Sequence, residues 1–188
     1  MTKAIAAAFL LASTLFAQDP SLLRHFDYDQ KAPLDIREAG VEQRGEVAIH
    51  DVSYASPKGG RVPAYLVVPK GKGPFAAVIW GHWYQDGSEF LNRKEFLEEA
   101  IALAPSGVVS LLPDGPIARP GFVRDPDPLG DLQIGQGVQT ILDMRRGADL
   151  LLARGDVDGS GSHMWGTVTT LRRERFWPAL ISASRHWC

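Results

Sequence analysis

The sequence predicts an α/β fold in which an antiparallel strand pair leads into a parallel strand-helix-strand-helix series. Three observations carry this prediction. Residues 46–55 and 62–68 alternate between apolar and polar side chains on either side of a Gly-rich turn. Two short apolar runs, at 76–80 and 108–112, are typical of strands buried on both faces. Segments with helical spacing follow each run, and a strand-helix-strand order implies a right-handed parallel crossover.

The first 17 residues have the features of a secretory signal peptide. Lys3 precedes an apolar run at 4–12, and the small Ala17 precedes polar Gln18 at a plausible cleavage position. The run is too short to span the ~30 Å of a bilayer's hydrocarbon core as a helix, and no cysteine follows it to carry a lipid. We therefore expect a secreted or periplasmic protein without a stable membrane anchor; the alternative is a buried or interfacial N-terminal helix.

An N-terminal arm and a hairpin come next. Residues 18–45 are charged and weakly periodic, and Pro33 and Gly40 interrupt any long helix there. The two alternating strands then flank a turn at 56–60. Because Pro63 cannot donate to a ladder, we expect the second strand to lie near a sheet edge or a bulge.

The parallel part of the chain is predicted from residue 76 onward. A helix at 90–104 follows the first apolar run, with its apolar and charged residues on opposite sides, and Gly107 ends it before the second run. Residues 113–130 hold five prolines in a loop too long to be a simple connection, and such loops usually border a site. A second helix is expected at 131–154, although Gly135, Gly137 and Gly147 lower its intrinsic propensity.

Composition excludes several classes of function. The chain of 188 residues is 45% hydrophobic and 22% charged, which is ordinary for a globular domain with a core. Its formal charge of −2 and its lack of basic clusters argue against binding to nucleic acid. Cys188 is the single cysteine, and the five histidines lack ligand spacing, so we expect neither a metal nor another cofactor. Nothing in the sequence indicates an oligomeric state.

Two segments resemble a known family. Pro74-Phe-Ala-Ala-Val-Ile-Trp-Gly-His-Trp-Tyr-Gln-Asp-Gly-Ser88 resembles the third strand of the α/β-hydrolase superfamily and the loop after it, and Leu111-Leu-Pro-Asp114 resembles the end of its fourth strand. The resemblance, towards dienelactone hydrolases and acetyl xylan esterases, covers roughly residues 47–158. It implies that residues 46–158 form the N-terminal half of an α/β-hydrolase sheet, acting in the intact relative on a small-molecule ester without a cofactor.

The resemblance also implies which residues border the site. In this family the loop after the third strand donates a backbone N–H to the oxyanion hole, where fixed dipoles stabilise charge that develops on the substrate carbonyl. Trp83 and Tyr84 are the oxyanion-hole candidates, although either can be an ordinary core or rim aromatic. His82 and Asp114 are candidates for the loops around the site. His82 follows a buried strand directly, which suits a residue that shapes the loop better than a general base.

The family's nucleophile is not found in this reading frame. The fifth strand of the family ends in Gly-x-Ser-x-Gly, a strained turn that exposes the serine, but the chain after Asp158 contains no such motif. Residues 159–188 have no clean strand or helix period, so we expect an irregular, non-native tail. Ser162 and His163 are sequence neighbours, which does not give a serine-to-histidine attack geometry. No catalytic residue is therefore assigned, and the family's acid and base also arise beyond this point.

The genetic code indicates a frameshift near residues 160–163. Methionine and tryptophan each have a single codon, so they fix what a neighbouring reading frame encodes. In the frame that joins the third base of each codon to the first two bases of the next, Met164-Trp165 must encode valine and Trp165-Gly166 must encode glycine. The following three codons are permitted to be histidine, serine and tyrosine, giving Val-Gly-His-Ser-Tyr, the family's strand end and elbow. The fifth elbow position, across Thr169-Thr170, can never be glycine. Further on, the same frame forces apolar residues across Phe176-Trp177-Pro178 (leucine, alanine) and across His186-Trp187-Cys188 (leucine, valine).

Two alternatives remain open at this point. The tail can be a true C-terminus with an unrelated extension, and Gly161-Ser-His-Met164 also resembles a cloning scar. The chain can also be an exported non-catalytic protein that keeps the α/β-hydrolase-like sheet and binds a ligand such as carbohydrate. Half of a doubly wound sheet leaves a long strand edge exposed, so a fragment of a hydrolase is expected to aggregate or to be degraded. A stable fold would therefore favour the non-catalytic binding protein.

Overall fold

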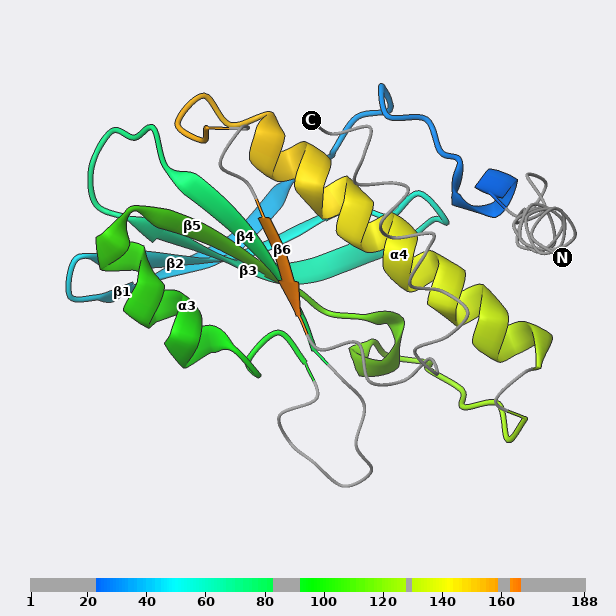
Figure 1. The fold of residues 1–188 in the computed structure, drawn as a ribbon. Helices are drawn as coiled ribbons and strands as arrows, with labels where there is room; N and C mark the ends of the chain where they lie inside the picture. The colour runs from blue at the N-terminus through cyan, green and yellow to red at the C-terminus, as the bar shows by residue number, and fades with distance from the viewer. Residues whose placement is uncertain (1–22, 83–91, 128–129, 159–162, 167–188) are drawn as a thin grey trace, which may run out of the picture.

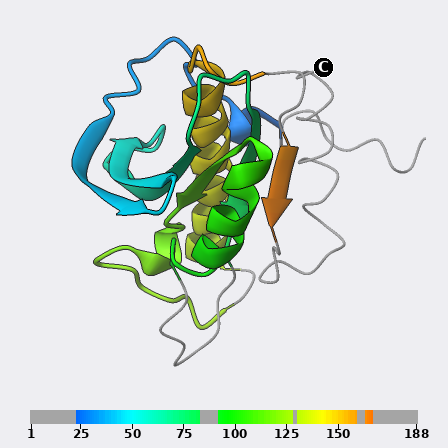
Figure 2. The same ribbon diagram turned by 90° about the vertical axis from the view of Figure 1, so that its left-hand side faces the viewer.

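A computed structural model describes residues 23–82, 92–127, 130–158 and 163–166. Six strands form one mixed sheet in the order β1-β2-β3-β5-β4-β6 (Figure 1). Figure 2 shows β6 at one edge of this sheet and β1 at the other. The elements are η1 (Arg24–Phe26), β1 (Arg37–Arg44), β2 (Val47–Ala55), β3 (Arg61–Pro69), β4 (Ala76–Gly81), α3 (Leu97–Leu103), η2 (Ala104–Ser106), β5 (Val108–Pro113), η3 (Pro116–Ala118), α4 (Asp131–Leu152) and β6 (His163–Gly166).

The predicted hairpin is confirmed. Strands β2 and β3 pair antiparallel from Val47 opposite Pro69 to Ala55 opposite Arg61. Gly59 and Gly60 take positive φ angles of 91° and 75° in the turn, a conformation that glycine adopts without a steric penalty. The turn residues therefore fix the register of the pair, and with it which side chains face the core.

The placement of Pro63 at a sheet edge is wrong. Strand β3 lies inside the sheet, between β2 and β5. The carbonyl of Pro63 accepts the N–H of Asp114 at 2.8 Å, just beyond the β3–β5 pairing that ends at Ala64 opposite Pro113. Because the N–H and C=O of a strand residue point the same way, the N–H that proline lacks would face the Asp114 carbonyl at the end of this ladder. That carbonyl accepts hydrogen bonds from Arg119 instead.

Strand β1 is an element that the sequence pattern did not predict. It lies within the stretch expected to be an arm and pairs antiparallel with β2. All eight of its residues are exposed, so it carries no apolar period from which a strand can be recognised. An irregularity between Glu38 and Gly40 shifts its register against β2.

The parallel half is confirmed. Strands β4 and β5 run parallel with Ala76 opposite Val108 and Ile79 opposite Leu111. Gly107, at a φ of 81°, ends the intervening helical segment in the left-handed conformation and donates its N–H to the Ala104 carbonyl at 2.9 Å.

Helix α3 begins later than expected, at Leu97 instead of residue 90. The side chain of Asn92 accepts the Lys94 N–H at 2.8 Å, a local bond that competes with helical hydrogen bonding. The Arg93 N–H donates outward to the Asp114 carboxylate at 2.7 Å. Residues 92–94 therefore make a turn facing the end of β5, and the helix starts after it.

Helices α3 and α4 cover opposite faces of the sheet. Alternating residues of β2 to β5 pack with Leu150 and Leu151 of α4 on one face and with Leu97 and Ala100 of α3 on the other. Helix α4 lies very close to the sheet at Gly147, where an added Cβ would come within 2.9 Å of the Leu111 side chain. No helix in the described ranges has both the length and the apolar character needed to cross a membrane.

The end of the described chain returns to the sheet beside β4. Val157 makes a parallel bridge with Phe75, just before β4 begins. Strand β6 then pairs parallel with β4, with Gly166 opposite Gly81. The tail was expected to be irregular, and β6 is a difference from that expectation because His163–Gly166 carries no strand period of its own. The rest of the tail, the signal-peptide segment 1–17, and Trp83 and Tyr84 lie outside the described residues.

Candidate functional site

The carboxyl ends of the parallel strands β4 and β5 meet at one edge of the sheet, which we call the rim. His82 follows β4, and Asp114 and Gly115 follow β5. Arg93, in the turn before α3, and Arg119, in the Pro-rich loop, reach the same place. Ligands of open α/β sheets bind at the carboxyl ends of strands, so the rim is the candidate site.

His82 joins the two loops of the rim. Its Nε2 accepts the backbone N–H of Gly115 at 2.8 Å. An imidazole nitrogen that accepts a hydrogen bond holds no proton, so the ring is neutral with its proton on Nδ1. The nitrogen that a general base would use is thus occupied by the β5 loop, and His82 shapes the rim.

Asp114 is a buried carboxylic acid at the rim, with 8% of its surface exposed. Its Oδ1 accepts the N–H of Arg93 at 2.7 Å, and its carbonyl accepts two N–H bonds from the Arg119 guanidinium at 3.1 and 2.7 Å. Burial raises the pKa of Asp114, and the Arg93 hydrogen bond and the nearby positive charges oppose that rise only in part. Asp114 thereby ties the turn before α3 to the Pro-rich loop.

Arg93 fixes the turn before α3 onto the sheet. Its guanidinium makes a two-bond contact with the Asp51 carboxylate on β2, at 2.6 and 3.0 Å. It also lies over the Tyr65 ring of β3, 4.3 Å from the centroid. Planar two-bond pairing and stacking on a ring are contacts that lysine cannot reproduce.

A second buried acid, Asp143 of α4, contacts the Pro-rich loop (residues 113–130) through Arg119. Its carboxylate accepts from Arg119 at 2.6 Å and from the Ser56 hydroxyl at 2.6 Å, and its carbonyl accepts the Tyr54 hydroxyl at 2.9 Å. Only 2% of Asp143 is exposed, and burial raises its pKa against the effects of Arg119 and Ser56. Removing one member of a buried ion pair strongly destabilises the fold, because the other member is left as an uncompensated buried charge.

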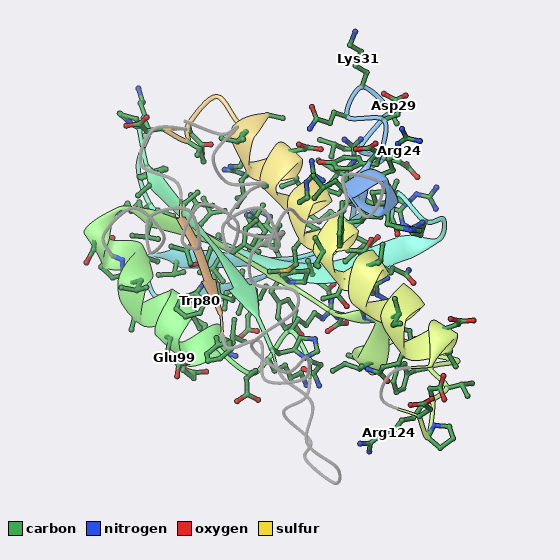
Figure 3. All side chains as sticks on the ribbon, turned by 45° about the vertical axis from the view of Figure 1, so that its right-hand side comes forward. Arg24, Asp29, Lys31, Trp80, Glu99 and Arg124 are labelled. Carbon is green, nitrogen blue, oxygen red and sulfur yellow. The ribbon has the colours of Figure 1, made fainter. Side chains whose placement is uncertain are left out.

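Trp80 lies just below the rim on the face covered by α3. Its ring stacks on Phe96, with centroids 5.4 Å apart and planes 26° from parallel. Figure 3 shows Trp80 in the interior of the molecule, whereas Glu99 of α3 extends outward. The Trp80 Nε1 and the Ser110 Oγ are buried polar atoms for which the described atoms supply no hydrogen-bond partner.

The sequence-predicted residues are only partly brought together. His82 and Asp114 both lie at the rim, while Trp83 and Tyr84 lie outside the described residues. Arg93, Arg119 and Asp143 were missed. The signal for Asp143 was available, because an acid within the apolar stripe of α4 must be paired if it is buried.

The side chains at and beside the rim form hydrogen bonds with neighbouring parts of the chain. The Ser56 hydroxyl donates to the Asp143 carboxylate, and the His82 Nε2 accepts the N–H of Gly115. Among the residues that can be placed, no group of three or more His, Cys, Asp or Glu side chains is arranged to hold a metal ion. The described rim is a frame that positions loops.

Solved structures share this fold. An acetyl xylan esterase from Paenibacillus sp. R4 superposes with a TM-score of 0.56 at 21% identity, covering 80% of this chain and 52% of that one. Acetyl xylan esterase 1 from Thermoanaerobacterium sp. JW/SL YS485 superposes with a TM-score of 0.56 at 15% identity, covering 76% and 48%. The chain thus has the fold of the N-terminal half of an α/β-hydrolase and spans about half the length of these structures. No family model and no curated protein matches it.

Proposed function

We propose that this chain is the front part of an exported serine hydrolase that cleaves carboxylic esters, and that as written it is inactive. The intact protein would use an elbow serine as nucleophile, a later histidine as base and an acid that orients it. The loop that begins after His82, with Trp83 and Tyr84, would supply an oxyanion-hole N–H.

One observation carries the proposal: the strand order β2-β3-β5-β4-β6. An antiparallel pair leads into parallel strands, and the chain after α4 returns to the far side of β4. In an α/β-hydrolase this return strand leads into the nucleophile elbow. Strand β6 ends at Gly166, and the second reading frame permits its serine across the codons of Thr167 and Val168, directly after that strand.

The two similar structures support the substrate class. Both are acetyl xylan esterases, which release an acyl group from an ester. Because the likeness is one of fold, the function rests on the combination of that fold with the permitted elbow sequence. No cofactor is needed for this chemistry.

The nucleotide sequence tests the proposal. Reading the gene from the codon for Gly155 through and past the stop codon is expected to show that one inserted nucleotide near codons 160–163 opens a longer frame. That frame should contain Gly-His-Ser-Tyr and, later, an acid and a histidine. A stop codon soon after codon 188 in that frame, or arginine, glycine or cysteine at the serine position, would rule the proposal out.

The restored gene tests the chemistry. With the nucleotide inserted, the purified product should hydrolyse p-nitrophenyl acetate, and the matched variant with alanine in place of the elbow serine should lose at least about 10³-fold in kcat. The 188-residue chain should hydrolyse no faster than that variant. If the serine variant keeps full activity, the elbow assignment is wrong.

Export is tested separately. When the gene is expressed with its leader in a bacterial host, we expect the protein outside the cytoplasm with Gln18 as its first residue, because cleavage after Ala17 removes the apolar segment. N-terminal sequencing of that fraction decides this. A chain that retains Met1 and stays in the cytoplasm would contradict it.

A further inference from the structure

Two neighbouring residues after β5 hold both ends of the segment that follows β4. This segment leaves the sheet at His82 and continues to Arg93, and residues 83–91 between them lie outside the described part of the chain. At its start, the Gly115 N–H donates to His82 Nε2 at 2.8 Å. At its end, the Arg93 N–H donates to Asp114 Oδ1 at 2.7 Å. The end of one strand therefore fixes both ends of the segment that follows the neighbouring strand.

Asp114 is itself held in place through its backbone. Its N–H donates to the Pro63 carbonyl of β3 at 2.8 Å. Its carbonyl accepts two hydrogen bonds from the Arg119 guanidinium, at 3.1 and 2.7 Å. A group that is fixed by its own packing and hydrogen bonds holds its partner in a defined geometry. The Asp114 carboxylate is therefore a rigid acceptor for the Arg93 N–H.

The contacts of Arg93 limit what the loss of Asp114 would disturb. The Arg93 guanidinium lies 3.9 Å from Asp114 Oδ2, but its two-bond contact with Asp51 and its position over the Tyr65 ring do not involve Asp114. Without the Asp114 carboxylate, the Arg93 side chain still attaches the turn to the sheet, whereas its N–H loses this acceptor. We therefore expect a local shift at the end of the segment, with the rest of the fold retained.

We propose that Asp114 is a positioning residue for ester hydrolysis, which sets the backbone between His82 and Arg93 where an oxyanion-hole N–H must lie. This inference rests on the proposed function, in which that segment supplies the N–H. Such a donor is effective only at about 2.7–3.1 Å from the developing oxyanion, and a misplacement of about 1 Å can cost about 10²-fold in rate. Asp114 acts through the segment and not on the substrate.

Hydrogen exchange in the unchanged 188-residue protein tests both attachments without any reaction. The amides of Arg93 and Gly115 should exchange at least about 100-fold more slowly than in an unfolded chain, because each is hydrogen-bonded at the rim. In Asp114→Ala, the Arg93 amide should lose this protection while the Gly115 amide keeps it. Rapid exchange of the Arg93 amide in the unchanged protein would overturn the proposal, and that result does not depend on whether a variant folds.

The restored full-length enzyme tests the effect on catalysis. With p-nitrophenyl acetate, Asp114→Ala should lower kcat by about 10- to 100-fold and leave KM within about twofold, because the weakened contact is made only in the transition state. Asp114→Asn keeps an oxygen that accepts the Arg93 N–H, and should stay within about threefold of the unchanged enzyme. His82→Phe removes the acceptor at the other end of the segment, and should also lower kcat without raising KM.

Asp156→Ala is the matched control for loss of a hydrogen-bonded carboxylate. Asp156 accepts from the Arg154 guanidinium at 2.9 and 2.6 Å, and its carbonyl accepts the Phe75 N–H before the amino end of β4, away from the rim. This variant should keep full kcat. If Asp114→Ala also keeps kcat within about twofold, or if asparagine restores nothing, Asp114 has no positioning role.

The two measurements separate this inference from the proposed function. If the restored, unchanged enzyme hydrolyses no ester, the proposed function fails, and the role of Asp114 in catalysis fails with it. Exchange of the Arg93 amide then still decides whether Asp114 holds the segment. If the enzyme is active and the Arg93 amide is protected, but Asp114→Ala is fully active, the proposed function stands and the positioning role alone is refuted.

Discussion

Helices α3 and α4 stabilise the sheet in different ways. Helix α4 is 22 residues long and buries two charged side chains, Asp143 and Arg146, each with partners from distant segments. Helix α3 is seven residues long and buries only Leu97 and Ala100. The α4 face therefore fixes the position of the rim through buried polar contacts, whereas the α3 face contributes apolar and aromatic packing.

Helix α4 also holds the N-terminal segment. Arg146 donates to the carbonyls of Gln30 and Ala32, and Arg145 donates to the Phe26 carbonyl and lies 5.0 Å from the centroid of the Tyr28 ring. Changes on the α4 face should therefore affect the rim and the N-terminal arm together, while changes around α3 should stay local.

Removing Arg119 should have the largest effect. Arg119→Met leaves Asp143 buried without its cation and removes two hydrogen bonds from the Asp114 carbonyl, so the free energy of unfolding should fall by about 3 kcal/mol. Denaturant unfolding measures this. A loss below about 1 kcal/mol would mean that the pair is not the main tie between α4 and the rim.

Gly147→Ala should have the next largest effect, about 1–2 kcal/mol of destabilisation, because the new methyl group meets Leu111 and the Tyr54 hydroxyl at 2.9 and 3.0 Å. Gly135→Ala in the same helix is the matched control, since nothing lies within 4 Å of its Cβ position. That variant should gain up to about 1 kcal/mol from helix propensity. Equal effects at both positions would contradict the close approach of α4 to the sheet.

The buried acids predict a pH dependence. Burial raises the folded-state pKa of Asp143 and Asp114 above the ordinary value of 3.8, so the folded chain binds more protons than the unfolded chain in that window. Their contribution to stability is present below pH 3.8 and is lost as the pH rises through the folded pKa values. Unfolding free energies measured from pH 4 upward should therefore decline less steeply for Asp143→Asn than for the unchanged chain. A steeper decline for the variant would mean that folding lowers the pKa of Asp143.

The smallest effect is expected where α3 meets β1. Arg44 pairs with Glu98 at 2.8 Å, but the two side chains are 38% and 79% exposed. Solvent and salt screen such a pair, so Glu98→Gln should leave the free energy of unfolding unchanged within experimental error. A measurable loss that vanishes in high salt would show that the α3 side depends on charge after all.

Much of the fold was predictable because its strands carry clear periods. The hairpin, the two buried strands and α4 all follow from spacing and from turn residues such as Gly107. Strand β1 was not predictable, because its eight exposed residues are ordered by pairing with β2 alone. Helix α3 starts later than expected because two backbone N–H groups before it bond to side chains. The Lys94 N–H donates to the Asn92 side chain, and the Arg93 N–H donates to the Asp114 carboxylate.

The site was less predictable than the fold. The resemblance indicated His82 and Asp114, which both lie at the rim, but it gave no sign of the arginines that hold them. Arg93 and Arg119 come from irregular segments, and their partners Asp51 and Asp143 are distant in sequence. Such contacts depend on tertiary placement and leave no periodic signal in the chain.

We propose that this chain supplies the frame of a hydrolase without an activated serine. Intact-mass analysis after treatment with a fluorophosphonate tests it most directly, because that reagent forms a covalent adduct with the activated nucleophile of a serine hydrolase. We expect the folded 188-residue protein to keep its unmodified mass. A stoichiometric adduct on any of its serines would contradict the claim.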